Sequence, residues 1–168
     1  MKFRKGTYND VNSIYQSLSD RDKEYVTPGR RDYKDVPKNL AARQVAYDDD
    51  LGDLPVGFVD IYGPYAESKI LRMPWAKPTP GYYTVEAAVR ESHRGRGLSP
   101  ELAKRAVKKV LAQIVKNRED AKARGFSSIP GEPDKIKWNF LRGNEKSERA
   151  AIRAGFKRVG NGRYAIDI

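Results

Sequence analysis

The residues with the clearest chemical potential occupy positions 94–99, which read RGRGLS and lie between a predicted strand and a predicted helix. Backbone N–H groups of such a glycine turn, at the positive end of a helix, form a cradle for a phosphate or a diphosphate. The pattern is not a P-loop, because GxxxxGK[ST] is absent, and Pro100 replaces the third glycine of the dinucleotide pattern GxGxxG. The turn therefore predicts an anion site, with a purely structural turn or an arginine contact to nucleic acid as alternatives.

Apolar periodicity predicts the elements that lead to this turn. A helix is expected over 7–19, with Thr7 and Asp10 as its capping pair. Residues 20–40 predict a short helix and a loop. Two strands are expected at 42–47 and 55–62, followed by a long surface loop over 63–80 and a strand over 82–89.

After the turn, apolar residues step by four from Leu98 to Ile114, with Val115 beside them, and predict a packed helix of about five turns. A loop is expected over 125–134, a strand over 135–141 and a short helix that ends at Gly155. Residues 156–159 and 163–168 flank Gly-Asn-Gly and predict a terminal hairpin. The fold class expected is α+β, with a mixed sheet.

Composition limits the chemistry. The chain has 168 residues, a formal net charge of +11, no cysteine and one histidine, His93. One domain over 1–168 is expected, without cysteine nucleophiles, cysteine-ligated zinc or a multi-histidine metal site, so the expected metal content is none. The sequence shows neither a signal peptide nor a membrane span, which predicts a cytoplasmic protein without a membrane partner.

The positive charge is concentrated at residues 104–118, KRAVKKVLAQIVKNR. Such a stretch fits nucleic acid, an acidic protein or a phosphate-rich cofactor as partner, and it equally fits a solvated helix face. Either a monomer or a homodimer is compatible with the sequence.

Two separated motifs resemble the GNAT superfamily of N-acyltransferases. The first is Ala-Ala-Val at 87–89 followed by R-x-x-G-x-S from Arg94, which is similar to the acetyl-CoA signature Q/R-x-x-G-x-G/A. The second is Asn144-x-x-Ser147 followed by Ala-Gly-Phe at 154–156. The resemblance covers nearly the whole chain, least well at 20–40 and 63–80. It implies a GNAT-like fold, a mostly antiparallel mixed sheet flanked by helices, in which the fourth and fifth strands splay apart.

The resemblance also implies acetyl-CoA as co-substrate. Its pantetheine arm would meet the strand before the turn, its diphosphate would lie in the turn, and Asn144 would approach from the fifth strand. The implied cofactor residues are Ala87, Ala88, Val89, Arg94, Gly95, Arg96, Gly97, Leu98, Ser99 and Asn144. Ser99 departs from the usual Gly or Ala and is expected to cap the following helix, with Pro100 at the first helical position.

The resemblance identifies the catalytic residues less clearly than the cofactor residues. Relatives often use a tyrosine four residues before Gly155 and a glutamate five before Asn144, whereas this chain has Ala151 and Asn139 there. Glu86 is the candidate base and Ser147 the candidate donor to the leaving thiolate; each has a purely structural alternative. A phenol from Tyr82, Tyr83 or Tyr164 is a further option, and His93 is interpreted as a loop residue that is not the base.

The leading hypothesis is an acetyl-CoA-dependent N-acetyltransferase that transfers the acetyl group directly to an amine. The acceptor would lie across the first helices and the 63–80 loop. One alternative is a GNAT-shaped module with weak or lost catalysis that binds nucleic acid through its basic surface. Another is an enzyme whose acceptor is carried by nucleic acid or by a nucleic-acid-associated protein.

Overall fold

The computed structural model describes residues 1–26, 39–66, 80–141 and 143–168. Most of the loop expected at 63–80, and the loop expected before residue 39, lie outside these ranges. No helix in the described ranges is long and apolar enough to cross a bilayer.

The described residues form one seven-stranded sheet, in the order β1-β2-β3-β4-β5-β7-β6. β4 and β5 run parallel, and every other neighbouring pair is antiparallel. This arrangement confirms the expected α+β class with a mostly antiparallel mixed sheet. The strands are β1 (Lys2–Arg4), β2 (Leu40–Asp48), β3 (Leu54–Ala66), β4 (Gly81–Val89), β5 (Lys135–Asn139), β6 (Lys157–Gly160) and β7 (Arg163–Asp167).

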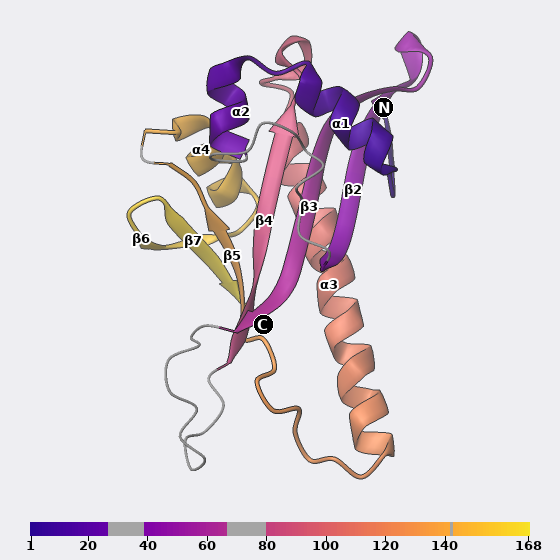
Figure 1. Ribbon diagram of the computed structural model, residues 1–168, viewed down its shortest axis with the longest axis vertical. Coiled ribbons are helices and arrows are strands. Elements are labelled where there is room, and N and C mark those ends of the chain that lie inside the picture. The colour runs from indigo at the N-terminus through magenta and orange to yellow at the C-terminus, as the bar shows by residue number, and fades with distance from the viewer. Residues whose placement is uncertain (27–38, 67–79, 142) are drawn as a thin grey trace.

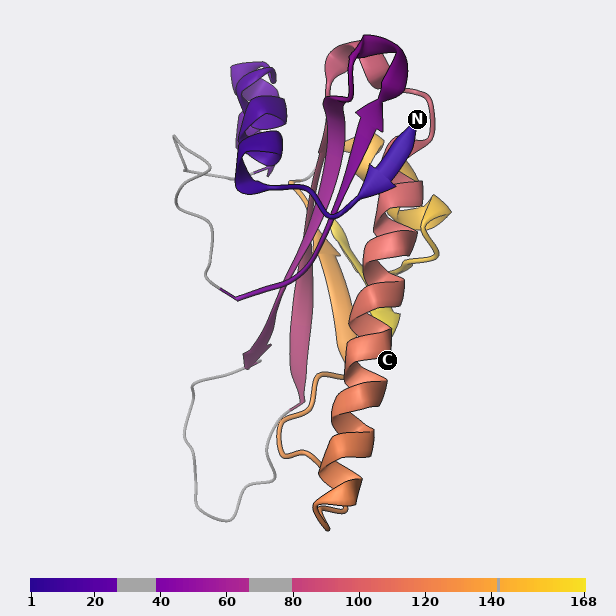
Figure 2. The ribbon, with the colours of Figure 1, turned by 90° about the vertical axis from the view of Figure 1, so that its right-hand side faces the viewer.

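Helices cover both faces of the sheet (Figure 1). The first helix, α1, and the long helix α3 lie on opposite faces, as Figure 2 shows edge-on. The short helices α2 and α4 stand near the end of β4. The bounds are α1 (Tyr8–Gln16), α2 (Asp20–Val26), α3 (Leu98–Ala123) and α4 (Glu145–Arg153), with short 3-10 turns at Asp49–Leu51 and Glu91–His93.

Several boundaries differ from the sequence predictions. β1 was not predicted, because three residues are too few to show alternation; it pairs with β2 through Lys2 opposite Tyr47. β3 continues to Ala66, into the segment predicted as loop, and α3 has 26 residues instead of about five turns. The capping pair of α1 is confirmed: Thr7 Oγ1 accepts from Asp10 N at 3.2 Å, and Asp10 accepts from Thr7 N at 2.6 Å.

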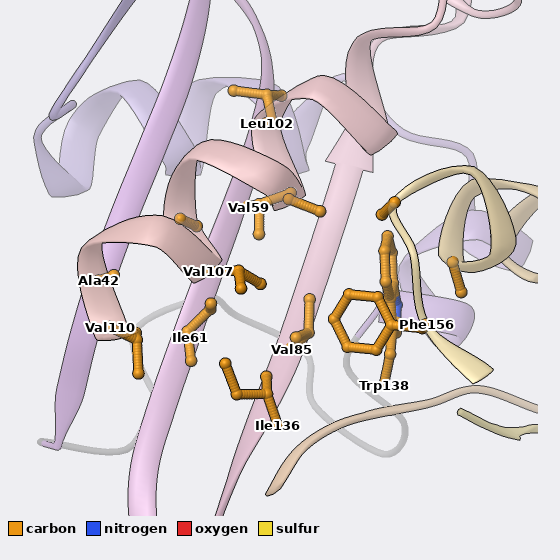
Figure 3. Close-up of a cluster of buried hydrophobic side chains, with 14 of the residues drawn as sticks. Ala42, Val59, Ile61, Val85, Leu102, Val107, Val110, Ile136, Trp138 and Phe156 are labelled. Atoms are coloured by element: carbon orange, nitrogen blue, oxygen red, sulfur yellow. The ribbon is translucent and has the colours of Figure 1, made fainter. Parts of the chain in front are cut away.

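The main core lies between the sheet and α3 (Figure 3). Leu102 and Val107 of α3 pack over Val59 and Ile61 of β3, and both β3 side chains are fully buried. At the other end of the core, Trp138 and Phe156 meet edge to face, with ring centroids 5.4 Å apart. A second cluster of buried side chains lies under α1. Val115 was expected in the apolar face of α3, but it is 51% exposed, because it lies about 100° around the helix from Ile114, which is buried in the core.

A charged row crosses the α1 face of the sheet. In register, Arg43 of β2 lies opposite Asp60 of β3, and Asp60 lies opposite Glu86 of β4. Arg43 donates to both carboxylate oxygens of Asp60, from Nε at 2.8 Å and from Nη2 at 2.6 Å. Tyr62 Oη donates to the same carboxylate at 2.8 Å. Because Asp60 is fully buried and Arg43 is 8% exposed, each charge depends on the other for stabilisation.

We expect Asp60→Ala to lower the free energy of unfolding by roughly 3 to 5 kcal/mol, because it leaves a buried guanidinium without its bidentate carboxylate. The double variant Arg43→Met/Asp60→Leu removes both charges and should recover most of that loss. Urea denaturation followed by circular dichroism measures both values. A loss below about 1 kcal/mol for the single variant would contradict this account of the pair.

Candidate functional site

β4 and β5 stop pairing with each other part of the way along β4. Their parallel pairing runs from Tyr82 opposite Lys135 to Thr84 opposite Lys137 and goes no further, although β4 continues to Val89. The expected splay of the fourth and fifth strands is therefore confirmed. With β1 counted as the first strand, these two strands are β4 and β5. Among the residues that the structure describes, one edge of the end of β4 therefore has no neighbouring strand.

A cleft of about 740 Å³ opens at this parting. Its walls come from the end of β4, the turn at 94–99, α2 and α4, with Trp138 of β5 also lining it. Most of the sequence-predicted cofactor residues meet here, although they lie far apart in the chain. Those lining the cleft are Ala87, Ala88, Val89, Arg94, Gly95, Gly97, Leu98, Ser99 and Asn144, together with Ser147.

The glycine turn takes a conformation that favours glycine. Gly95 and Gly97 have φ of 78° and 75°, and a Cβ on either would meet open space, so that side of the turn is free to receive a ligand. The expected cap by Ser99 is wrong: α3 begins at Leu98, its N-cap is Gly97, and no side chain caps it. Pro100 is accordingly the third helical residue rather than the first, still a position whose N–H would have no partner within the helix.

Arg94 is held by two hydrogen bonds and lies 4.0 Å from the carboxylate of Glu91. Its Nη2 donates to Asp22 Oδ2 of α2 at 2.9 Å, and its Nε donates to the carbonyl of Val89 at 3.2 Å. Burial raises the pKa of Asp22, but hydrogen bonds from Ser19 and Arg94 outweigh it and hold this pKa below its usual value. Asp22 was not recognised from the sequence, because nothing in an exposed short helix indicates a partner so distant in the chain.

Arg96 does not line the cleft. Its Nη2 lies 3.4 Å from the carbonyl of Ser92, on the outer side of the turn. Of the two arginines predicted to face a diphosphate, only Arg94 is brought to the cleft.

His93 lies in the connection between β4 and α3, as expected, at the end of the 3-10 turn Glu91–His93, but its side chain is buried. Its Nε2 lies 2.8 Å from Asp48 Oδ2, and its Nδ1 lies 2.8 Å from Ser92 Oγ. A carboxylate only accepts hydrogen bonds, so Nε2 carries a proton, and in the neutral ring Nδ1 accepts from the serine hydroxyl. This hydrogen bond holds the pKa of Asp48 below its usual value and ties the end of β2 to the turn. His93 does not line the cleft, so its position fits a structural role.

α4 presents its first turn to the cleft. Asn144 is the N-cap, and its Oδ1 accepts from the backbone N–H of Ser147 at 3.1 Å. Ala151, which stands at the position of the family's tyrosine, is fully buried in the core.

The three tyrosines considered as proton donors do not reach the cleft. Tyr83 and Tyr164 are buried in the core, and Tyr82 lies under the ammonium of Lys137. Tyr164 donates to Glu148, and this hydrogen bond raises the pKa of the phenol. A different phenol, Tyr25 of α2, lines the cleft; it lay in a segment whose charged sequence gave no pattern to single it out.

Glu86 does not line the cleft, although the next residue, Ala87, does. Glu86 lies two residues before Ala88, so both side chains project from the same face of β4. Glu86 is half-buried, and its Oε2 is shielded from solvent. This is not the outward-facing strand carboxylate that was the structural alternative.

Sequence reasoning also missed the cations of the cleft. Three basic residues of α4 and one of α2 line it, whereas the sequence had drawn attention to 104–118. The spacing of the α4 set, three and then four residues apart, was the available signal. The four are Arg21, Lys146, Arg149 and Arg153.

No family model and no curated protein matches this sequence. Its structure is similar to several solved structures. The GNAT domain of S. lividans PAT is 21% identical, with 99% of this chain and 89% of that chain covered and a TM-score of 0.59. The aminoglycoside acetyltransferase AAC(6')-Ib, in complex with coenzyme A and kanamycin, is 16% identical, with 99% and 94% covered and a TM-score of 0.59.

Arabidopsis thaliana NAA60, in complex with a bisubstrate analogue, is 19% identical, with 99% of this chain and 98% of that chain covered and a TM-score of 0.54. These similarities extend over nearly the full length of each protein, and they agree with the strand order and the parting of β4 and β5 described above. The chain therefore has the fold of the GNAT acetyltransferases, as its two sequence motifs predict.

Proposed function

We propose that this protein is an acetyl-CoA-dependent N-acetyltransferase. The observation that carries the proposal is the cleft where β4 leaves β5, with the glycine turn of residues 94–99 in its wall. Solved proteins of this fold have been crystallised with coenzyme A and an aminoglycoside, and with a bisubstrate analogue. They support the choice of reaction class, whereas the acceptor amine of this chain is left open.

The residues of the cleft fit the parts of acetyl-CoA. The turn at Gly95 and Gly97 offers backbone N–H groups and the positive end of α3 to the diphosphate, and Arg94 adds a cation. The end of β4, Ala87 to Val89, offers backbone groups along an edge that no described strand covers on the β5 side, which suits the amide groups of the pantetheine arm.

The reaction needs a neutral amine and a proton for the departing thiolate. Acetyl-CoA supplies the activated acetyl group as a thioester. Glu86, next to the cofactor-facing end of β4, is proposed as the base that takes the proton from the amine, directly or through water. Ser147, in the first turn of α4 and lining the cleft, is proposed to donate to the thiolate. Because the chain contains no cysteine, transfer without an enzyme thioester is proposed.

A second candidate concerns the acceptor. Lys104, Lys108 and Lys109 lie on the exposed side of α3, and none has an ion pair with another described residue. A row of uncompensated lysines on one helix face suits phosphates. This favours an acceptor attached to nucleic acid or to a nucleic-acid-associated protein.

The diphosphate assignment is tested by placing negative charge in the turn. Gly97→Asp adds a carboxylate but also forces a side chain onto a φ of 75°. Ser99→Asp avoids that strain, since an acidic residue is favourable in the first turn of a helix. We expect each variant to weaken acetyl-CoA binding at least about tenfold by isothermal titration calorimetry.

The matched control is Ser99→Asn, which has nearly the same shape without the charge and should bind within about threefold of the parent. If Ser99→Asp folds normally and binds acetyl-CoA as tightly as the parent, the cofactor is not held at this turn.

The base assignment is tested by Glu86→Gln, which keeps the shape of the side chain and removes its basicity. An amine with a pKa near that of lysine is mostly protonated at neutral pH, so turnover should fall about 100-fold there. The affinity for acetyl-CoA should change less than about twofold, and the loss should shrink as the pH is raised towards the pKa of the amine.

Steady-state rates across pH 6 to 10 on a panel of amines provide this measurement, with the exposed Glu119→Gln on α3 as control. An unchanged pH–rate profile in Glu86→Gln would show that another group or water takes the proton.

The lysine row is tested by Lys104→Gln/Lys108→Gln/Lys109→Gln. The parent should bind a labelled DNA duplex weakly, and the steepness of log affinity against log salt should fall by about two to three in the variant. Removing two charges from β6 instead, with Lys157→Gln/Arg158→Gln, should leave the slope unchanged. Fluorescence anisotropy at several salt concentrations measures this slope. If the parent does not bind DNA at low salt, the lysine row is ordinary solvated surface.

A further inference from the structure

Helix α4 turns three cations towards the cleft. Lys146, Arg149 and Arg153 stand at positions i, i+3 and i+7, which share one face of a helix, and all three line the cleft. The turn at 94–99 lines the same cleft. The charge of these three side chains is therefore concentrated on the cleft and is not spread around the helix.

Little in the described protein neutralises these cations. Within the described ranges, Arg149 has one carboxylate neighbour, Glu145 at 3.6 Å, and that pair is weak because both side chains are largely exposed. Neither Lys146 nor Arg153 has a hydrogen bond or an ion pair with another described residue. Three acids also line the cleft: Glu145, Glu91 and Asp22. Asp22 and Glu91 both neighbour Arg94, although Lys146 also helps to lower the pKa of Asp22.

The position of Lys146 is also unfavourable for the helix itself. It lies in the first turn of α4, where unpaired N–H groups create a positive potential that disfavours a cation. Lys146, Arg149 and Arg153 carry like charges on one helix face, so they repel one another when no anion lies between them. An anionic ligand in the cleft would remove this repulsion, so the arrangement suits binding more than it suits the stability of α4.

We propose that Lys146, Arg149 and Arg153 bind the phosphate monoester on the ribose of coenzyme A and make the enzyme distinguish coenzyme A from its 3′-dephospho form. This inference rests on the proposed function. The diphosphate is assigned to the backbone N–H groups of the turn at 94–99 and to Arg94, so the remaining phosphate, with a charge of about −1.5 to −2, needs cations of its own. The forked guanidinium groups of Arg149 and Arg153 suit a phosphate that is held from two sides.

The test compares binding of coenzyme A and 3′-dephospho-coenzyme A to the full chain by isothermal titration calorimetry. The parent should bind coenzyme A at least about tenfold more tightly. In Lys146→Gln/Arg149→Gln/Arg153→Gln, the affinity for coenzyme A should fall to that for the dephospho form, and the affinity for the dephospho form should change less than about threefold. The control Lys5→Gln/Lys157→Gln/Arg158→Gln removes the same charge from exposed positions outside the cleft and should keep the preference.

Three results would overturn the inference in distinguishable ways. Equal binding of both ligands by the parent, with Ser99→Asp still weakening both, would remove the inference and leave the proposed function standing. An equal loss for both ligands in the α4 variant would assign its cations to the diphosphate instead. Failure of the folded parent to bind either ligand would remove the proposed function together with the inference.

Discussion

The architecture of the site depends on one event in the sheet, the end of parallel pairing between β4 and β5 after Thr84 and Lys137. Up to that point the two strands satisfy each other's backbone groups. Beyond it, the last residues of β4 keep β3 on one side only, and the other side opens into the cleft. α2, α4 and the turn before α3 gather around this opening, so segments that are distant in the chain become neighbours because the sheet divides there.

The charged row on the α1 face connects the rigid part of the sheet to the proposed chemistry. Arg43 and Asp60 compensate each other in a buried position, and Glu86 is the next member of the row. A carboxylate beside an unpaired Asp60 would meet a second negative charge at close range. Beside the Arg43–Asp60 pair it meets a nearly neutral neighbour. The pair thus allows a second acidic residue on the face that adjoins the cleft.

Features that depend on local sequence patterns could be predicted from the sequence. The glycine turn, the apolar face of the first part of α3 and the capping box of α1 follow from spacing within a few residues. The prediction that Ser99 caps α3 is wrong because a small shift in where a helix begins changes which residue is the N-cap. The burial of His93 could not be predicted, because its partner, Asp48, is separated from it by 45 positions and only the fold brings them together. The α4 cations were visible as a spacing, but nothing local shows which way a helix face points.

The contact between Asp22 and Arg94 has a consequence for how the protein moves. α2 contains no buried residue, and the hydrogen bond from Arg94 to Asp22 attaches it to the turn before α3. A segment with so little burial opens at a small fraction of the global free energy of unfolding, so its amides exchange with solvent while the sheet stays closed. Since the guanidinium that restrains α2 also belongs to the proposed diphosphate site, local opening of this helix and occupancy of the turn are not independent events. Any anion that draws Arg94 towards the turn loosens α2, and any acid that keeps Arg94 in place competes with that anion.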